Sequence, residues 1–145
     1  MEDARSQSFV LDSSVAIAWV VKSQATEATD SLLQNVFDGT TLWVPVLWSY
    51  EFGNVLLTLS RRRRLSEEDR NRAQSFLFRL EAQIDDDGLR RKMDQTTNLA
   101  VRHKLSLYDA AYLELALRLE IPLATRDVDL AEAATKCRVT VLPRP

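Results

Sequence analysis

The feature of this sequence that most constrains its fold is an alternation between short apolar runs and longer amphipathic segments. The runs are apolar on both faces and rich in β-branched or aromatic residues, as is typical of strands that a parallel sheet buries on both sides. They lie at 9–11, 42–44, 123–125 and 139–142, and a short fifth strand is allowed near Leu105. Strands and helices that alternate in this way predict an α/β fold.

The segments between the runs carry apolar residues at helical spacing. The predicted helices lie at 26–37, 48–59, 66–82, 89–104, 108–119 and 127–134. Because parallel strands joined by helices need right-handed crossovers, we expect a three-layer α/β/α sandwich with a central, mainly parallel, four- to five-stranded sheet. No linker or change of composition divides the chain, so residues 1–145 are expected to form a single domain.

Composition excludes several classes of protein. The chain has only 3 glycines in 145 residues, so it contains neither a G-x-G-x-x-G turn nor a P-loop for nucleotide phosphates. Cys137 is its single cysteine, which excludes an intrachain disulfide and a cysteine zinc site and favours a reducing compartment. No apolar run approaches the ~20 residues that cross a bilayer. We therefore expect a cytoplasmic protein that does not interact with membranes.

Acidic residues follow the predicted strands, where ligands of parallel sheets bind. Asp12 comes directly after the first run, and Asp127 comes two residues after the third. Glu51 lies in the helix after the second run, and Asp109 opens the helix that follows Leu105. Each aspartate could simply cap the start of a helix. Glu51 lies on or beside an apolar stripe, where an unpaired carboxylate is costly to bury.

Four carboxylates at one edge of a sheet repel one another, so we expect a cation among them. Mg²⁺ or Mn²⁺ binds hard carboxylate oxygens and keeps several water ligands. Such an ion lowers the pKa of a bound water and neutralises charge that develops on a phosphate. The sequence therefore predicts metal-assisted hydrolysis of phosphodiesters at Asp12, Glu51, Asp109 and Asp127.

Four segments, in this order and spacing, carry a family pattern. They are FVLDSS at 9–14, YEFGNVL at 50–56, LSLYDAAYL at 105–113 and LATRD at 123–127. With them the sequence resembles the PIN-domain ribonucleases, and most closely the VapC-type toxins of type II toxin–antitoxin systems. The resemblance implies an acidic Mg²⁺ or Mn²⁺ site at the same four acids. It also implies supporting hydroxyls at Ser13 and Thr125, and a place near the site for Asn54.

The same resemblance implies partners. The expected substrate is RNA, the expected assembly is a homodimer, and a small antitoxin protein is expected to cover the active site. The family pattern favours Asp127 over its near neighbour Asp129 as the fourth acid. For Glu114, an extra acid in an otherwise apolar helix, we favour a solvated or salt-bridged role over a place in the site.

A basic run, Arg61, Arg62, Arg63 and Arg64, ends the helix that carries Glu51. Cations at a helix C-terminus are favourable to the helix dipole whatever the function. In a chain whose formal net charge is -2, the run also forms a local positive patch that can follow an RNA backbone. Both interpretations remain open.

Two other functions compete with the nuclease. An aspartyl-phosphate phosphatase or phosphoacceptor domain would use Asp12 as the group that receives phosphate, but a phosphatase of the haloacid dehalogenase type needs a second acid where this chain has Ser14. A non-catalytic PIN-like interaction module would keep the acids only as helix caps. Loss of one of the four acids would have favoured that module, and none is lost.

Overall fold

A five-stranded sheet lies at the centre of the computed structural model, which describes residues 7–144. The strands are β1 (Ser8–Leu11), β2 (Thr41–Pro45), β3 (Gln83–Asp85), β4 (Leu123–Ala124) and β5 (Val141–Leu142). Their order is β3-β2-β1-β4-β5, and each of these neighbouring pairs is parallel. The expected parallel sheet is confirmed. The proposed domain, 1–145, also includes residues 1–6 and 145, which lie outside the described residues.

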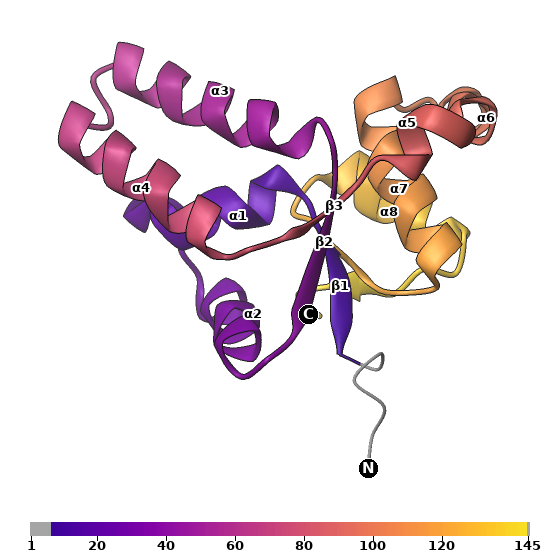
Figure 1. The fold of residues 1–145 in the computed structure, drawn as a ribbon, viewed down its shortest axis with the longest axis horizontal. Helices are drawn as coiled ribbons and strands as arrows, with labels where there is room; N and C mark the ends of the chain where they lie inside the picture. Colours follow the sequence, from indigo (N-terminus) through magenta and orange to yellow (C-terminus); the bar gives the residue numbers. More distant parts are fainter. Residues whose placement is uncertain (1–6, 145) are drawn as a thin grey trace.

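Helices cover both faces of the sheet (Figure 1). One group consists of α1 (Ser13–Val20), the short 3-10 helix η2 (Lys22–Gln24), α2 (Glu27–Phe37), α3 (Trp48–Arg61) and α4 (Glu67–Arg79). The other consists of α5 (Asp87–Arg91), α6 (Met93–His103), α7 (Leu107–Leu119) and α8 (Val128–Lys136). The three-layer α/β/α fold is therefore confirmed. Between residues 7 and 144, no helix has both the length and the apolar character needed to cross a membrane.

The fifth strand does not lie near Leu105, so that expectation is wrong. Lys104 ends α6 in the left-handed conformation at φ 54, and Ser106 already caps α7, which leaves no room for a strand between them. The fifth strand is β3, which pairs with the edge of β2. Ile84 of β3 is 61% exposed, so this edge strand lacks the two-sided apolar pattern of the buried strands.

The single helix predicted at 89–104 is also wrong, because the structure divides this segment between α5 and α6. Lys92 ends one helix and precedes the next, with a non-helical φ of -121 and ψ of 14. The start of α5 is held to the sheet, since the Gly88 N–H donates to Asp85 Oδ2 at 3.1 Å. The start of α5 is thus fixed to the end of β3, and the break at Lys92 separates α5 from α6.

The order of the strands reverses beside β1, and we call the edge of the sheet at the carboxyl ends of β1 and β4 the crevice. From β1 the chain moves to β2 and β3 on one side, and later returns to β4 and β5 on the other. The Asp12 N–H donates to the Ala124 carbonyl at 2.9 Å, so the carboxyl ends of β1 and β4 lie together. Such a reversal of strand order is where open α/β sheets bind ligands.

The core between the sheet and α7 sets the position of this crevice, which gives a stability prediction. Leu113 of α7 is fully buried, so Leu113→Ala is expected to lower the free energy of unfolding by about 2–5 kcal/mol, through lost burial and a residual cavity. Urea unfolding followed by circular dichroism measures the change. The control Val101→Ala, at a position 76% exposed on α6, should stay within about 0.5 kcal/mol of wild type. Equal losses in the two variants would contradict the packing described here.

Candidate active site

Asp12 lies at the centre of the crevice, directly after β1. It is only 4% exposed, and although it occupies the position before α1, its side chain makes no capping hydrogen bond. Its Oδ2 accepts instead from the Ser14 hydroxyl at 2.6 Å and from the Thr125 hydroxyl at 2.8 Å. The simple cap interpretation therefore fails for Asp12. This carboxylate is held by two hydroxyls, one of which comes from the loop after β4.

Glu51 is half-buried in the first turn of α3 and is fixed from a distant part of the chain. The hydroxyl of Tyr112, a fully buried residue of α7, donates to Glu51 Oε1. Burial and the negative charge of Glu51 raise the pKa of the Tyr112 phenol, so it stays protonated and remains a donor. This bond ties the starts of α3 and α7 together on one side of the crevice.

Asp109 and Asp127 lie at the starts of two helices. The Asp109 N–H donates to the capping hydroxyl of Ser106 at 3.0 Å, and Asp109 is half-buried in the first turn of α7. Asp127 is exposed and does act as a cap, because its Oδ1 accepts from the Leu130 N–H at 2.8 Å. Asp127 can therefore cap α8 and also belong to the acidic site, because capping uses only one of its two carboxylate oxygens.

The charges of the four acids act on one another. Burial raises the pKa of Asp12, and the charge of Asp127 raises it further, against the lowering effect of the Ser14 and Thr125 hydrogen bonds. Burial also raises the pKa of Glu51 and of Asp109, and in both the charge of Asp12 adds to the effect. The crevice therefore brings together carboxylates that resist simultaneous ionisation.

The predicted supporting residues lie near these acids in different ways. Thr125 is buried and bridges two of them, because its hydroxyl donates to Asp12 and accepts from the Asp127 N–H at 3.1 Å. Asn54 is exposed one turn after Glu51 on α3. Ser13 is half-buried and contributes a backbone hydrogen bond to Asp12.

Sequence reasoning missed two residues that position the acids. They are Ser14, which binds Asp12 and also accepts from the Arg126 N–H at 2.9 Å, and Tyr112, which binds Glu51. A signal for Tyr112 was present, since it lies three residues after Asp109 and so on a neighbouring part of the same helix surface. For Ser14 the sequence offered only its presence in the FVLDSS segment.

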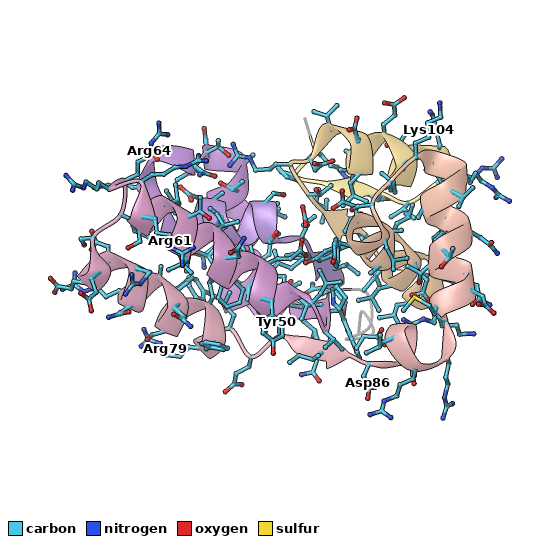
Figure 2. The ribbon with its side chains drawn as sticks, turned by 90° about the horizontal axis from the view of Figure 1, so that it is seen from above. Tyr50, Arg61, Arg64, Arg79, Asp86 and Lys104 are labelled. Carbon is cyan, nitrogen blue, oxygen red and sulfur yellow. The ribbon has the colours of Figure 1, made fainter. Side chains whose placement is uncertain are left out.

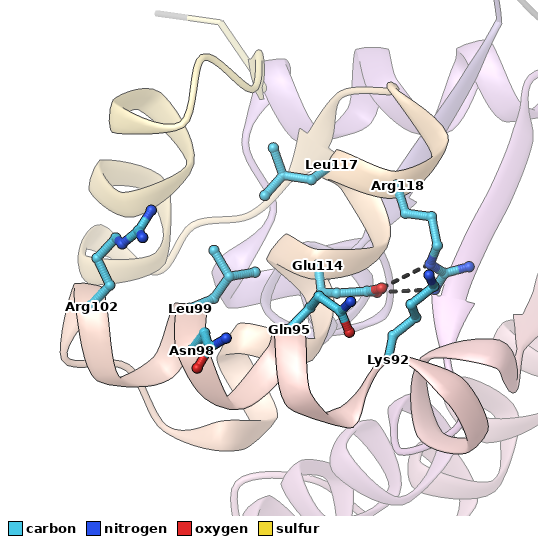
Figure 3. A pocket seen from close by; sticks show the side chains of 8 residues that line it. All are labelled: Lys92, Gln95, Asn98, Leu99, Arg102, Glu114, Leu117 and Arg118. Atoms are coloured by element: carbon cyan, nitrogen blue, oxygen red, sulfur yellow. Dashed lines mark hydrogen bonds and ion pairs between the residues drawn. The ribbon is translucent and has the colours of Figure 1, made fainter.

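Glu114 lies outside this acidic site, as favoured from the sequence. It is 5% exposed, and its carboxylate accepts from Arg118 Nε at 2.8 Å (Figure 3). Arg118 also donates to both oxygens of Asp85, at 2.9 and 2.7 Å. The three side chains form a largely buried ion triad that joins α7 to the end of β3. Asp129 is exposed, and its charge is one of the weaker effects that raise the pKa of Asp109.

The basic run lies at the other end of α3 from Glu51. Arg61 is ten residues beyond Glu51, a rise of about 15 Å along the helix. Figure 2 shows Tyr50, next to Glu51 in sequence, well separated from Arg64. All four arginines, Arg61, Arg62, Arg63 and Arg64, are exposed. Contact with RNA at this run therefore requires a substrate that extends along α3 from the acids.

The chemistry of the donors fits a hard divalent cation. The crevice offers carboxylate and hydroxyl oxygens, and burial together with the charges of neighbouring acids raises the pKa of Asp12, Glu51 and Asp109, an effect that a cation would oppose. Within residues 7–144, no three His, Cys, Asp or Glu side chains are grouped so that they could hold a metal ion. Mg²⁺ does not need three protein ligands, because it commonly takes one or two carboxylates and retains water ligands.

Comparison with known proteins places the chain in a family. Its sequence matches the model of the PIN domain over residues 9–136. Its fold is similar to that of PAE2754 from Pyrobaculum aerophilum, with a TM-score of 0.71 and 20% sequence identity over 94% of this chain and 83% of that one. The chain therefore belongs to the PIN domain family.

Its relatives within that family are of the VapC type. The chain is 31% identical over 137 residues to VapC ribonuclease Mb0985 of Mycobacterium bovis. The identity to ribonuclease VapC9 of Mycobacterium tuberculosis is the same. Each alignment covers 93% of this chain and 98% of the relative. The resemblance seen in the four sequence segments is thus confirmed.

The repulsion among the acids predicts how the stability of the metal-free protein depends on pH. Acids whose pKa is raised by folding bind protons more tightly in the folded chain, so the free energy of unfolding rises as the pH falls from neutrality toward the raised pKa values. Asp109→Asn removes one charge. It should raise Tm at neutral pH and reduce the further rise on acidification.

Thermal melts in a chelating agent, at a series of pH values, measure both effects. Asp30→Asn is a matched control, because it removes an exposed carboxylate of α2, and it should leave the pH dependence as in wild type. A lower Tm in Asp109→Asn, with the pH dependence of wild type, would show that the acids do not repel one another as described.

Proposed function

We propose that this protein is an endoribonuclease that hydrolyses phosphodiester bonds in RNA with Mg²⁺ or Mn²⁺. The observation that carries the proposal is the placement of Asp12, a buried carboxylate that caps no helix and feels the charge of Asp127. Burying a carboxylate among like charges costs free energy. Carboxylates placed at such a cost are typical of catalytic sites, and a site that binds a cation accounts for this one. The names of the VapC ribonucleases that it is similar to support the same activity.

In this proposal the chain positions its acids from several directions. Ser14 and Thr125 orient the Asp12 carboxylate, and Tyr112 orients Glu51 through a phenol that stays protonated. Asp109 joins them from the first turn of α7, and Asp127 offers the oxygen that its helix cap leaves over. A divalent ion bound there supplies a water of lowered pKa and neutralises charge on the phosphate.

The biological role we propose is that of the toxin in a toxin–antitoxin pair, acting in the cytoplasm as a single nuclease domain over residues 1–145. The VapC names of its relatives support a small antitoxin as partner. A cavity of about 580 Å³ is lined by apolar residues such as Trp19, Val20 and Phe76 and by the charged residues Lys22, Arg64, Asp69 and Arg72, and this mixed surface suits a segment of such a partner. Homodimer formation is part of the same proposal.

Neither the phosphoacceptor nor the non-catalytic module is favoured by any feature of the crevice.

Substitution of the central acids tests the activity. Asp12→Asn and Asp109→Asn should each lower cleavage of total cellular RNA on the order of a thousandfold, because each removes a charged oxygen from the cation site. Purified protein is assayed in Mn²⁺ and in Mg²⁺ after any bound partner is removed by unfolding and refolding. A chelating agent should abolish the wild-type activity.

Asp30→Asn again serves as the control and should cleave like wild type, since this exposed acid lies on α2. A comparison of Asp127→Asn with Asp129→Asn identifies the fourth acid, and the larger loss is expected at Asp127. Metal-dependent cleavage that survives in Asp12→Asn would exclude this crevice as the catalytic centre.

The basic run gives a separate prediction. Replacement of Arg61, Arg62, Arg63 and Arg64 with Ala should weaken RNA binding and flatten its dependence on salt, because fewer counterions are released from the RNA. Titration of fluorescent RNA with catalytically inactive Asp12→Asn protein, at several salt concentrations, measures the slope. An unchanged slope of affinity against salt concentration would show that the arginines do not contact RNA and act only on the dipole of α3.

A further inference from the structure

A second site lies beside the acids, at the starts of α3 and α7. It is a cavity of about 300 Å³, at the lower end of the range of roughly 300–1,000 Å³ for small-molecule sites. We call it the tyrosine pocket. The residues that line it and matter here are Tyr50, Tyr108, Leu89, Met93, Glu114 and Asp85.

The tyrosine pocket and the acidic crevice share two helices. On α7, Tyr108, Ala111 and Glu114 line the pocket at helical spacing, while Asp109 and Tyr112 belong to the crevice. On α3, Tyr50 lines the pocket and the next residue, Glu51, belongs to the crevice. A nucleotide chain whose phosphate lies at the acids therefore has this pocket beside it.

The walls of the pocket suit a flat aromatic ligand. Tyr50 is 81% exposed and Tyr108 is 64% exposed, so two phenol rings stand open to solvent at its rim. Leu89 and Met93 add exposed apolar surface. Proteins bind unpaired bases of RNA by stacking them on aromatic side chains, which raises the affinity roughly 5- to 150-fold per base.

The polar groups of the pocket are carboxylates. Glu114 and Asp85 line it, and both are held by the single cation Arg118, which leaves the triad with an excess of one negative charge. Arg118 donates to all four of these carboxylate oxygens, and the Gly88 N–H donates to Asp85 Oδ2 as well. A carboxylate oxygen accepts up to two hydrogen bonds, so both oxygens of Glu114 can accept one more. The Watson–Crick edge of guanine carries N–H donors at N1 and N2, so it complements these oxygens.

We propose that the tyrosine pocket binds one base of the RNA substrate next to the cleaved bond, and that Glu114 and Asp85 make guanine the preferred base. The proposal rests on the ribonuclease function proposed above. A second copy of this chain is the other occupant, and the tests below distinguish it from a base.

The first test is the sequence preference of cleavage. Wild-type protein cuts a randomised single-stranded RNA in Mn²⁺, and the new ends are sequenced. Guanine should be enriched at one position next to the cut, and inosine there, which lacks the N2 amine, should lower the cleavage rate. Tyr108→Ala should reduce the enrichment about tenfold, whereas Tyr108→Phe, which keeps the ring, should restore it.

The control variant is Phe37→Ala. Phe37 is an aromatic side chain 61% exposed at the end of α2, on the other side of the sheet from α7 (Figure 1). Its loss should change neither the rate nor the preference. Cleavage by wild type with no base preference at any position would overturn the pocket proposal while the ribonuclease function stands.

A binding measurement separates failure of the pocket from failure of the nuclease. Inactive Asp12→Asn protein is titrated with fluorescent oligouridine that contains either one guanosine or one adenosine. Tighter binding of the guanosine probe, lost in the double variant with Tyr108→Ala, supports the pocket even if wild type cleaves no RNA. Equal affinities overturn it. A change of molar mass in solution caused by Tyr108→Ala would also overturn it, because the rim would then be an interface between copies.

Discussion

Repulsion among carboxylates gathered at the end of β1 is the constraint on which the rest of the site depends. Asp12 is almost fully buried, and the Ser14 and Thr125 hydroxyls bind its Oδ2. Two neighbouring acids are likewise fixed by hydrogen bonds, Glu51 to Tyr112 of α7 and Asp127 to the start of α8. The fold thus holds together charges that would otherwise separate.

Helix α7 connects most of the functional surface. Tyr112 and Asp109 face the acids, Leu113 packs in the core, and Glu114 enters the ion triad with Arg118. This helix can serve all these environments because successive residues point about 100° apart around its axis. Of its charged residues, Arg118 reaches Asp85 at the end of β3, and Glu114 is bound by Arg118 one turn away on the same helix.

Much of the fold was predictable from the sequence, because the central strands are buried on both sides. Residues 9–11 are at most 2% exposed, and the apolar run that marks them has no other use. The edge strand β3 could not be found in this way, since Ile84 faces solvent. The positions of the acids after the strands predicted the crevice. Thr125 was expected beside them, but Ser14 and Tyr112 were not, because such bonds depend on side-chain directions, and the bond from Tyr112 joins residues far apart in the sequence.

The bond between Thr125 and Asp12 spans 113 positions of the sequence. The carboxylate that follows β1 therefore gains one of its two hydroxyl partners only after β4 has been made. Contacts of such long range form late, because a large loop must close before they contribute. Assembly of the crevice thus waits for β4, because the Asp12 carboxylate lacks the Thr125 hydroxyl until that strand has joined the sheet.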